Sequence, residues 1–296
     1  MKSASRKRGG VGANIIMTLV YLFLYAPMIV MLIFSFNSTK STSKFTSFSL
    51  KWYQEVFFGN SKLLNFLFNS ILLAVVSSVI ATVIGTVAAV GIYKLKSKRA
   101  EGVFKTVNNI PVMNPDIVTG VSLMMLFIFV SGLLGKTGDS TNFFTLLIAH
   151  ITFNIPYVIL NVLPKLRSTD PALMEAAQDL GCTPFKAFMK AVFPQLTPAI
   201  ISALLMAFTL SFDDFVISYY TSGKDFNTLP VYIYTMVKKP MKLDVYAMYS
   251  VIFVTILVLL ILYNVIQNRS DPVNVKQRQI KKLKKLEKKN NRKENA

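Results

Sequence analysis

Apolar stretches of about 20 residues recur along this chain, and no other feature of the sequence restricts its fold so strongly. Each is long enough to cross the apolar core of a bilayer, roughly 30 Å thick, as a helix. They predict an all-α integral membrane protein with a single six-helix transmembrane domain over residues 14–268. The six stretches lie at about 14–36, 66–93, 103–130, 143–163, 196–220 and 245–266.

The composition supports a membrane protein and excludes several other classes. Of the 296 residues, 53% are hydrophobic and only 16% are charged, whereas soluble globular chains carry about a quarter charged residues. A soluble enzyme, a disordered chain and a secreted disulfide scaffold are therefore excluded. The single cysteine, Cys182, cannot form an internal disulfide. Basic segments beside a membrane explain the net charge of +19 better than nucleic-acid binding does.

The distribution of Lys and Arg predicts how the helices are oriented. If the N-terminus lies inside, most of the 33 Lys and Arg residues fall in segments that face the cytoplasm, including a basic N-terminus at 1–13 and a basic tail at 269–296. Cytoplasmic loops of membrane proteins carry such an excess. We therefore expect both termini in the cytoplasm and the segment around Trp52 outside.

Two of the stretches carry signals for their packing. The second has small residues at intervals of four, which let another helix approach closely. These residues are Ser77, Ala81, Gly85 and Ala89. The third begins near Val103 or Pro111 and is interrupted by Pro111 and Pro115, so its first half is expected to be kinked or partly unwound.

The segment between the fourth and fifth stretches, at about 165–195, is longer than a simple helix connection. Start and stop signals predict two helices in it. The first begins after Asp170, a good N-cap, and stops at Gly181. The second covers 185–193 and is expected to end at Pro194.

The first of these predicted helices has a small apolar face. Its members are Leu173, Ala176, Ala177 and Leu180, with Glu175 and Asp179 alongside. Such a face suits docking into a groove on another protein. An amphipathic helix lying on the membrane surface explains the pattern equally well, and the residue pattern alone leaves both readings open.

This segment resembles a known motif. The run Glu175-Ala176-Ala177, followed by Gly181 and Pro194, is similar to the EAA motif of permease subunits in binding-protein-dependent ABC importers. In that family the loop is the coupling helix that inserts into a cleft of the ATPase subunit. The resemblance implies a two-helix coupling loop at about 165–195. The residues implied in ATPase coupling are Glu175, Ala176, Ala177, Asp179, Gly181 and Pro194.

The resemblance runs from the first stretch to the sixth and implies a MetI-like fold. Ala191 and Phe193 stand where the motif usually has Ile and Leu, while Pro194 is kept. Further segments resemble the PotC-type permeases of spermidine/putrescine importers. They are Lys51-Trp52-Tyr53, Asn114 to Val118, His150 to Phe153, and Ser211 to Asp214.

Three carboxylates, those of Asp116, Asp213 and Asp214, lie inside apolar stretches. A carboxylate at the centre of a membrane costs about 2.5–3.5 kcal/mol on insertion scales, and neighbouring stretches place no Lys or Arg at comparable depth. A transported cation would supply the missing counter-charge. Adjacent helical residues point about 100° apart. One of the pair Asp213–Asp214 is therefore expected to line a pathway, and the other to face a partner helix or accept backbone or hydroxyl hydrogen bonds, with Ser211 as the nearest hydroxyl.

Aromatic residues accompany these carboxylates and complete the candidate substrate pathway. They are Phe212, Phe215, Tyr219 and Tyr220, with Trp52 in the first external segment. Desolvated aromatic faces attract alkylammonium ions by about 2 kcal/mol, which suits a flexible polycation. The alternatives are that the aspartates cap or kink a broken helix, that the aromatics form an interfacial belt, and that Trp52 packs its loop. In PotC-type permeases the matching acidic and tryptophan positions are associated with polyamine transport.

The combined reading is a permease subunit of an ATP-driven ABC importer for polyamines such as spermidine and putrescine, in a bacterial cell membrane. Expected partners are a second homologous permease, a pair of ATPase subunits, an extracytoplasmic polyamine-binding protein and membrane lipids, but no nucleic acid. No catalytic residue, metal or cofactor is expected in this chain, because ATP and Mg belong to the ATPase subunits. His150 is expected to serve helix packing through hydrogen bonds.

Two alternatives to this reading stay open. The first is the same machine with another cargo, such as an amino acid, sulfate or ferric iron. Acidic residues without basic ones in the apolar stretches argue against an anionic cargo. The second is a secondary transporter or channel, which needs no ATPase.

Overall fold

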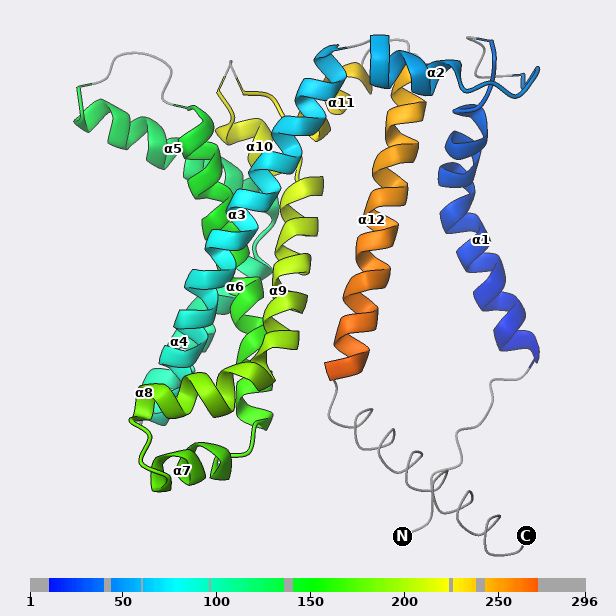
Figure 1. The fold of residues 1–296 in the computed structure, drawn as a ribbon. Coiled ribbons are helices and arrows are strands. Elements are labelled where there is room, and N and C mark those ends of the chain that lie inside the picture. The colour runs from blue at the N-terminus through cyan, green and yellow to red at the C-terminus, as the bar shows by residue number, and fades with distance from the viewer. Residues whose placement is uncertain are drawn as a thin grey trace, which may run out of the picture. The chain divides into compact units, whose positions relative to one another are not determined.

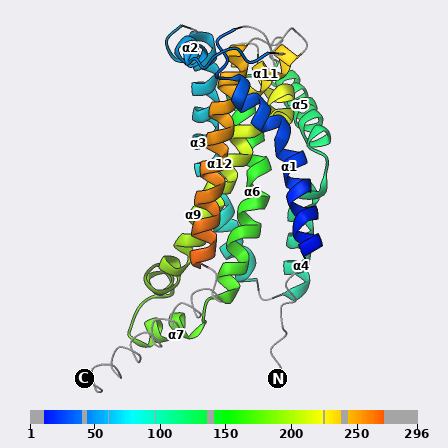
Figure 2. The same ribbon diagram turned by 90° about the vertical axis from the view of Figure 1, so that its right-hand side faces the viewer.

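The structure is a computed structural model that describes residues 11–39, 44–59, 61–95, 97–135, 141–223, 226–237 and 243–270 (Figure 1, Figure 2). Within these ranges the chain is mainly helical, and it contains no β-strand beyond one isolated antiparallel bridge between Asn37 and Phe48. Six helices are long and apolar enough to cross a membrane, as predicted. They cover Ile15–Phe34, Lys62–Tyr93, Asp116–Leu133, Phe143–Ser168, Pro184–Asp213 and Val245–Leu262.

The described helices belong to two compact units. The first lies within residues 1–64 and 236–255, and the second within 65–235 and 256–296. The first contains α1 (Val11–Phe34), α2 (Lys51–Gln54), the π-helical turn η1 (Glu55–Gly59) and the first part of α12 (Leu243–Ser270). The basic residues 1–10 and the tail from 271 lie outside the described residues.

In the first unit, Trp52 packs into the segment that follows α1. Its side chain is only 5% exposed, and its Nε1 donates a hydrogen bond to the carbonyl oxygen of Asn37 at 2.6 Å. The hydroxyl of the next residue, Tyr53, lies 2.8 Å from the hydroxyl of Ser35. Trp52 therefore fastens α2 to the end of α1, which is the loop-packing role among the alternatives considered for it.

The core of the second unit forms where α3 (Ser61–Tyr93), α6 (Phe143–Ser168) and α9 (Phe193–Asp213) meet (Figure 1). The small residues of α3 face this core. A Cβ added to Gly85 would lie 2.7 Å from the Cβ of Val158, and Ser77, Ala81 and Ala89 are buried. The prediction of a close helix approach along this stripe is confirmed.

The third apolar stretch is two helices. Helix α4 (Lys98–Met113) ends before Asn114 and Pro115, and α5 (Asp116–Leu133) follows. The interruption predicted at Pro115 is confirmed, because a proline disfavours helical geometry in the residue before it. Pro111, in contrast, lies inside α4 without ending it, so its predicted interruption is wrong. Only α5 is long and apolar enough for a span.

The segment 165–195 contains the two predicted helices, with one correction. Helix α7 (Ala172–Asp179) is followed by α8 (Pro184–Ala187), the π-helical turn η2 (Phe188–Val192) and then directly by α9. Pro194 was expected to end the second helix. Instead it lies in the first turn of α9, where a proline is tolerated because the first N–H groups of a helix have no helical acceptor.

The fifth apolar stretch also differs from the prediction. Helix α9 ends at Asp213 rather than continuing to Tyr220, and the short α10 (Val216–Thr221) follows after a break. A further helix, α11 (Leu229–Val237), lies between the fifth and sixth predicted stretches, where no helix was predicted. Asp213 and Asp214 are therefore at a helix end and not in the middle of a span.

Candidate functional site

The break between α9 and α10 gives the two adjacent aspartates different surroundings. Asp213, the last residue of α9, is exposed, whereas the side chain of Asp214 is only 7% exposed. The carboxylate of Asp214 accepts hydrogen bonds from the backbone N–H groups of Ile217 at 3.3 Å and Ser218 at 2.7 Å. These N–H groups begin α10 and have no acceptor within that helix. Asp214 therefore caps the helix that follows the break.

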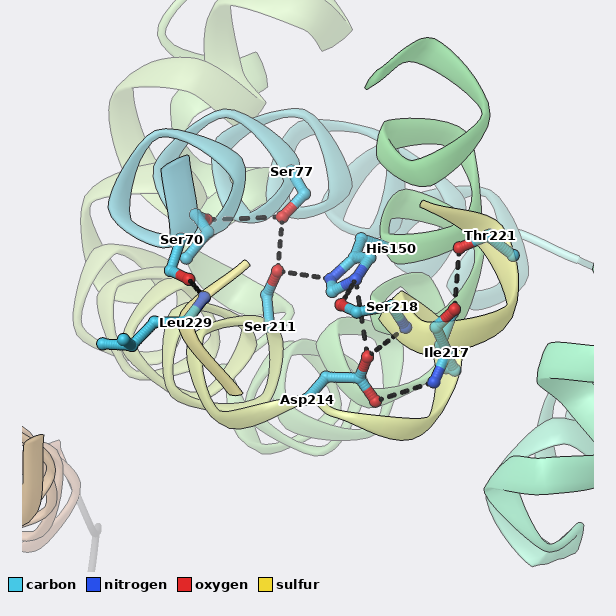
Figure 3. A network of polar contacts seen from close by, with 10 residues as sticks. Ser70, Ser77, His150, Ser211, Asp214, Ile217, Ser218, Thr221 and Leu229 are labelled. Atoms are coloured by element: carbon cyan, nitrogen blue, oxygen red, sulfur yellow. Dashed lines mark hydrogen bonds and ion pairs between the residues drawn. The ribbon is translucent and has the colours of Figure 1, made fainter. Parts of the chain in front are cut away.

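A buried polar network surrounds this cap and joins four helices (Figure 3). His150 of α6 is fully buried, with its Nδ1 2.7 Å from the hydroxyl of Ser211 and its Nε2 3.0 Å from the hydroxyl of Ser218. The same Nε2 lies 3.5 Å from Oδ2 of Asp214. The hydroxyl of Ser211 is also 2.8 Å from that of Ser77 in α3. The network thus ties α3, α6 and α9 to the start of α10.

This arrangement changes how the aspartate pair is read. Asp214 has fixed hydrogen-bond donors within the protein, so it does not require a transported cation as its partner. Asp213 is the member of the pair that remains accessible. Ser211 was expected near the aspartates as a hydroxyl partner, but its close partners are His150 and Ser77, and it reaches Asp214 only through the imidazole ring.

Aromatic rings gather directly after the break. The ring of Phe215 lies 5.6 Å from that of Tyr219 and 4.1 Å from that of Tyr234 in α11, measured between centroids. Tyr219 and Tyr220 make a T-shaped pair at 5.3 Å. These four residues are called the aromatic cluster below. Phe212 is not part of it, because its buried ring stacks on Phe208 within α9.

The second break, between α4 and α5, contributes a third carboxylate. Asp116 is exposed and begins α5. The residue before it is Pro115, so no side chain at the N-cap position caps that helix. One turn later, a Cβ added to Gly120 would lie 3.2 Å from the Tyr220 ring and 3.4 Å from the Cα of Ile217. Helix α5 therefore packs closely on α10, and the helices that follow the two breaks touch. Trp52 belongs to the other compact unit.

The loop at 170–194 exposes the residues of the EAA-like run. Glu175, Ala176 and Asp179 are exposed, and Ala177 is half-buried. Gly181 has a φ of +84°, and the N–H of Cys182 bonds the carbonyl of Ala177 at 3.1 Å, so the helix ends in a left-handed turn that favours glycine.

Two large apolar side chains of the loop face solvent. Leu180 is 87% exposed and Phe185 is 75% exposed. In the same loop, Glu175 and Met174 line a cavity of about 350 Å³ together with Lys94 and other residues near the C-terminal ends of α3 and α6. This part of the chain therefore offers an apolar edge and a recess, which are features of an interaction surface.

Several residues of the site were missed by sequence reasoning. Tyr234 was overlooked because no helix was predicted in the segment 226–237, although Thr228 and Pro230 are start signals for a helix. Ser77 and Ser218 could not be foreseen as partners of His150, since their contacts depend on how the helices pack. Among the described residues, no group of three or more His, Cys, Asp or Glu side chains could hold a metal ion.

Comparison with known proteins places the chain in a family. It is 34% identical over 238 residues to the putrescine transport system permease protein PotI of Escherichia coli strain K12, an alignment that covers 80% of this chain and 84% of PotI. It is 35% identical over 245 residues to the spermidine/putrescine transport system permease protein PotC of the same strain, which covers 83% and 89% of the two chains.

A solved structure and a family model agree with this placement. A bacterial ABC transporter involved in the import of the acidic polysaccharide alginate superposes with a TM-score of 0.65 and 17% identity, over 88% of this chain and 94% of that one, which shows a shared fold. Residues 81–273 match the model of the inner membrane component of binding-protein-dependent transport systems. The chain therefore belongs to the family of binding-protein-dependent transport system inner membrane components.

Proposed function

We propose that this chain is a permease subunit of an ATP-driven importer that carries polyamines, with spermidine and putrescine as the expected substrates, across a bacterial cytoplasmic membrane. The observation that carries the proposal is the match to two polyamine permeases over about four fifths of the chain. The fold by itself does not choose the cargo, because a transporter of an acidic polysaccharide has the same fold.

The chemistry around the α9–α10 break supports a cationic cargo. Asp213 presents an accessible carboxylate, and the aromatic cluster begins two residues later with Phe215. A polyamine carries ammonium groups separated by methylene links, so it can alternate between charge contacts and aromatic faces. Asp116, which is exposed at the other break, is a second candidate for the same pathway. Asp214 holds the break in shape.

The loop at 170–194 is proposed to couple transport to ATP hydrolysis. Its Glu175-Ala176-Ala177 run, the turn at Gly181 and the exposed Leu180 would dock on an ATPase subunit. Docking would bury the apolar edge of the loop, which is otherwise costly to leave in water. A pair of ATPase subunits would bind ATP and Mg, and this chain would bind neither.

The remaining partners follow from the family. A second, homologous permease would pair with this chain to form the path, and an extracytoplasmic binding protein would deliver the polyamine. The membrane orientation proposed is both termini and the 170–194 loop in the cytoplasm, as the distribution of Lys and Arg predicts.

Uptake by the reconstituted complex tests the cargo. Vesicles that contain both permeases and the ATPase subunits, supplied with the binding protein and ATP, should accumulate labelled spermidine and putrescine. An excess of an amino acid, sulfate or ferric iron should not compete. Asp213→Asn should lower the rate about tenfold, the loss of roughly 1.4 kcal/mol of attraction, while leaving the amount of assembled complex unchanged. Uptake by Asp213→Asn at the parental rate would reject the role of this carboxylate.

The coupling role has its own test. Glu175→Ala or Gly181→Val should leave ATP hydrolysis uncoupled from uptake or reduce the amount of ATPase that co-purifies with the permeases. The matched control is Lys98→Ala, an exposed residue at the start of α4, outside the loop. Unchanged coupling in both loop variants would contradict the assignment, and uptake without ATP would favour a secondary transporter.

A further inference from the structure

His150 is a buried polar side chain whose hydrogen-bonding atoms all have partners, and the proposed function gives it no task. The residue is fully buried on α6, and both ring nitrogens have partners at hydrogen-bond distance. Its neighbour one turn along the same helix, Asn154, is equally buried, yet neither of its amide atoms has a hydrogen-bond partner among the described residues. A polar side chain buried in this core does not necessarily find hydrogen-bond partners. The partners of His150 therefore call for an explanation.

The direction of the hydrogen bonds around His150 follows from its neighbours. Oδ2 of Asp214 already accepts the N–H of Ser218, and Nε2 of His150 lies 3.0 Å from the hydroxyl of Ser218 and 3.5 Å from that carboxylate oxygen. An acceptor faces a donor, so the tautomer with hydrogen on Nε2 fits this side of the ring. Nδ1 then accepts from the hydroxyl of Ser211, and Ser211 accepts from Ser77. Every donor in this series of hydrogen bonds points toward Asp214.

The position of Asp214 in turn constrains Asp213. The two residues share one peptide bond at the point where α9 ends, and the carboxylate of Asp214 is held from two sides, by the first N–H groups of α10 and by the imidazole. The angle between two helices can change at a break between them. The contacts of Asp214 with α10 and those of His150 in α6 fix the angle between α9 and α10, and with it the direction in which the exposed side chain of Asp213 points.

We propose that His150 is a positioning residue for the transported polyamine: through its Nε2, which contacts the hydroxyl of Ser218 and faces Asp214, it fixes the α9–α10 break and thereby the direction in which Asp213 meets the cation. This inference rests on the proposed function, in which Asp213 contacts the cargo. His150 itself touches neither the cargo nor the outside of the protein.

Two amide replacements separate the two sides of the ring. Glutamine places an amide near the position of Nε2, so His150→Gln keeps a donor toward Asp214. Asparagine is shorter and reaches only the position of Nδ1, so His150→Asn keeps a partner for Ser211 but loses Asp214. If the contacts on the Nε2 side matter, uptake should fall about tenfold in His150→Asn, which corresponds to about 1.4 kcal/mol, and less than about threefold in His150→Gln.

A double-mutant cycle distinguishes positioning from a general packing role. Uptake is measured in the reconstituted complex at saturating binding protein, per assembled complex, for His150→Asn in the parental chain and in the Asp213→Asn background. A residue that acts through Asp213 should cost about tenfold in the first and less than about twofold in the second, because coupled residues are not additive. The thermal stability of each variant is measured in parallel.

Each outcome has a definite meaning. Equal losses in both backgrounds would show that His150 acts independently of Asp213 and would overturn the inference, as would parental uptake by His150→Asn. If Asp213→Asn itself transports at the parental rate, the role of that carboxylate in the proposed function fails first, and the inference fails with it. If His150→Asn does not assemble, Ser218→Ala, which removes the hydroxyl 3.0 Å from Nε2 on the side of the ring that faces Asp214, takes its place in the cycle with the same criteria.

Discussion

The two interrupted membrane stretches are built from different chemistry. Between α4 and α5 the break is made by the backbone alone, because Pro115 restricts the residue before it and no side chain caps α5. Between α9 and α10 there is no proline, and the break is held by Asp214, the first N–H groups of α10 and His150. One interruption is therefore local, and the other depends on contacts with a distant helix.

The two breaks differ in what sets the angle between the helices that flank them. A proline break is present whether or not the rest of the protein is folded, but it leaves the angle between the two helices to their packing. A break held by hydrogen bonds has a defined angle and disappears when its partners are removed. The helices that follow the two breaks touch at Gly120, where α5 packs on α10. The hydrogen-bonded break between α9 and α10 can therefore help to set the angle at the proline break between α4 and α5.

The largest effect is expected from removing the cap of the second break. Asp214→Ala should cost about 1 kcal/mol for the lost cap and about 1–3 kcal/mol for buried donors left without an acceptor. The matched control is Asp213→Ala, whose exposed side chain should contribute less than about 0.5 kcal/mol to stability. Thermal unfolding in detergent measures both. Equal stabilities of the two variants would remove the distinction between the aspartates.

The contact between α5 and α10 at Gly120 should be nearly as sensitive to substitution. Gly120→Val pushes a branched side chain into Tyr220 and Ile217, and overpacking of this kind costs about 1–3 kcal/mol. Gly132→Val is the control on the same helix, because no described atom lies within 4 Å of a Cβ at that position. Stability and uptake should both fall for the first variant only. Similar losses for both would mean that helix propensity, not packing, decides the result.

The proline break predicts a moderate effect on transport. Pro115→Ala lets the helix continue through Asn114, and we expect uptake to fall about twofold to fivefold, less than 1 kcal/mol, while the protein remains folded. Pro111→Ala is the control, since α4 passes through Pro111 without a break. Labelled-substrate uptake in vesicles measures both. A larger loss from Pro111→Ala would place the critical interruption elsewhere.

The smallest effect on stability is expected from replacing Asn154, one helical turn from His150. The buried amide of Asn154 has no hydrogen-bond partner among the described residues, so Asn154→Leu, which is similar in size, should leave stability unchanged or raise it by up to about 1 kcal/mol. Asn161→Leu should lower stability, because that amide contacts the carbonyl of Tyr157 and the sulfur of Met206, each at 3.0 Å. A clear loss from Asn154→Leu would indicate a bound water or ligand at this amide.

The same contrast explains what could be predicted from the sequence. The spans follow from hydropathy, and Pro115, Gly181 and the small residues of α3 act through local geometry, so all of these could be anticipated. The end of α9 at Asp213 could not, because the apolar pattern resumes at Phe215 and the break depends on His150 of another helix. Pro194 was misread because a proline is as acceptable at the start of a helix as it is after its end.

The candidate site was predicted in part for the same reason. The sequence predicted that one aspartate of the pair would face a partner helix or accept backbone or hydroxyl hydrogen bonds, and Asp214 accepts backbone hydrogen bonds, but it does so because α9 ends at Asp213 and not because of the 100° between neighbours on a helix. Which of the two it would be, and that Ser211 would bind His150 instead, required the packing of α3, α6 and α9. Tyr234 escaped notice because its helix is too short to stand out by periodicity.

The change of helix direction between α8 and α9 has a further consequence (Figure 1). The 21 residues of α9, at 1.5 Å each, make a helix about 30 Å long that ends at Asp213, and η2 joins its other end to the exposed loop. A helix transmits a displacement along its axis, and the turn at η2 is where a sideways movement of the loop would enter α9. In the proposed mechanism, a displacement of the loop would reach Asp213 through η2 and α9, so the proposed ATPase contact and the proposed cargo contact would lie near opposite ends of one helix.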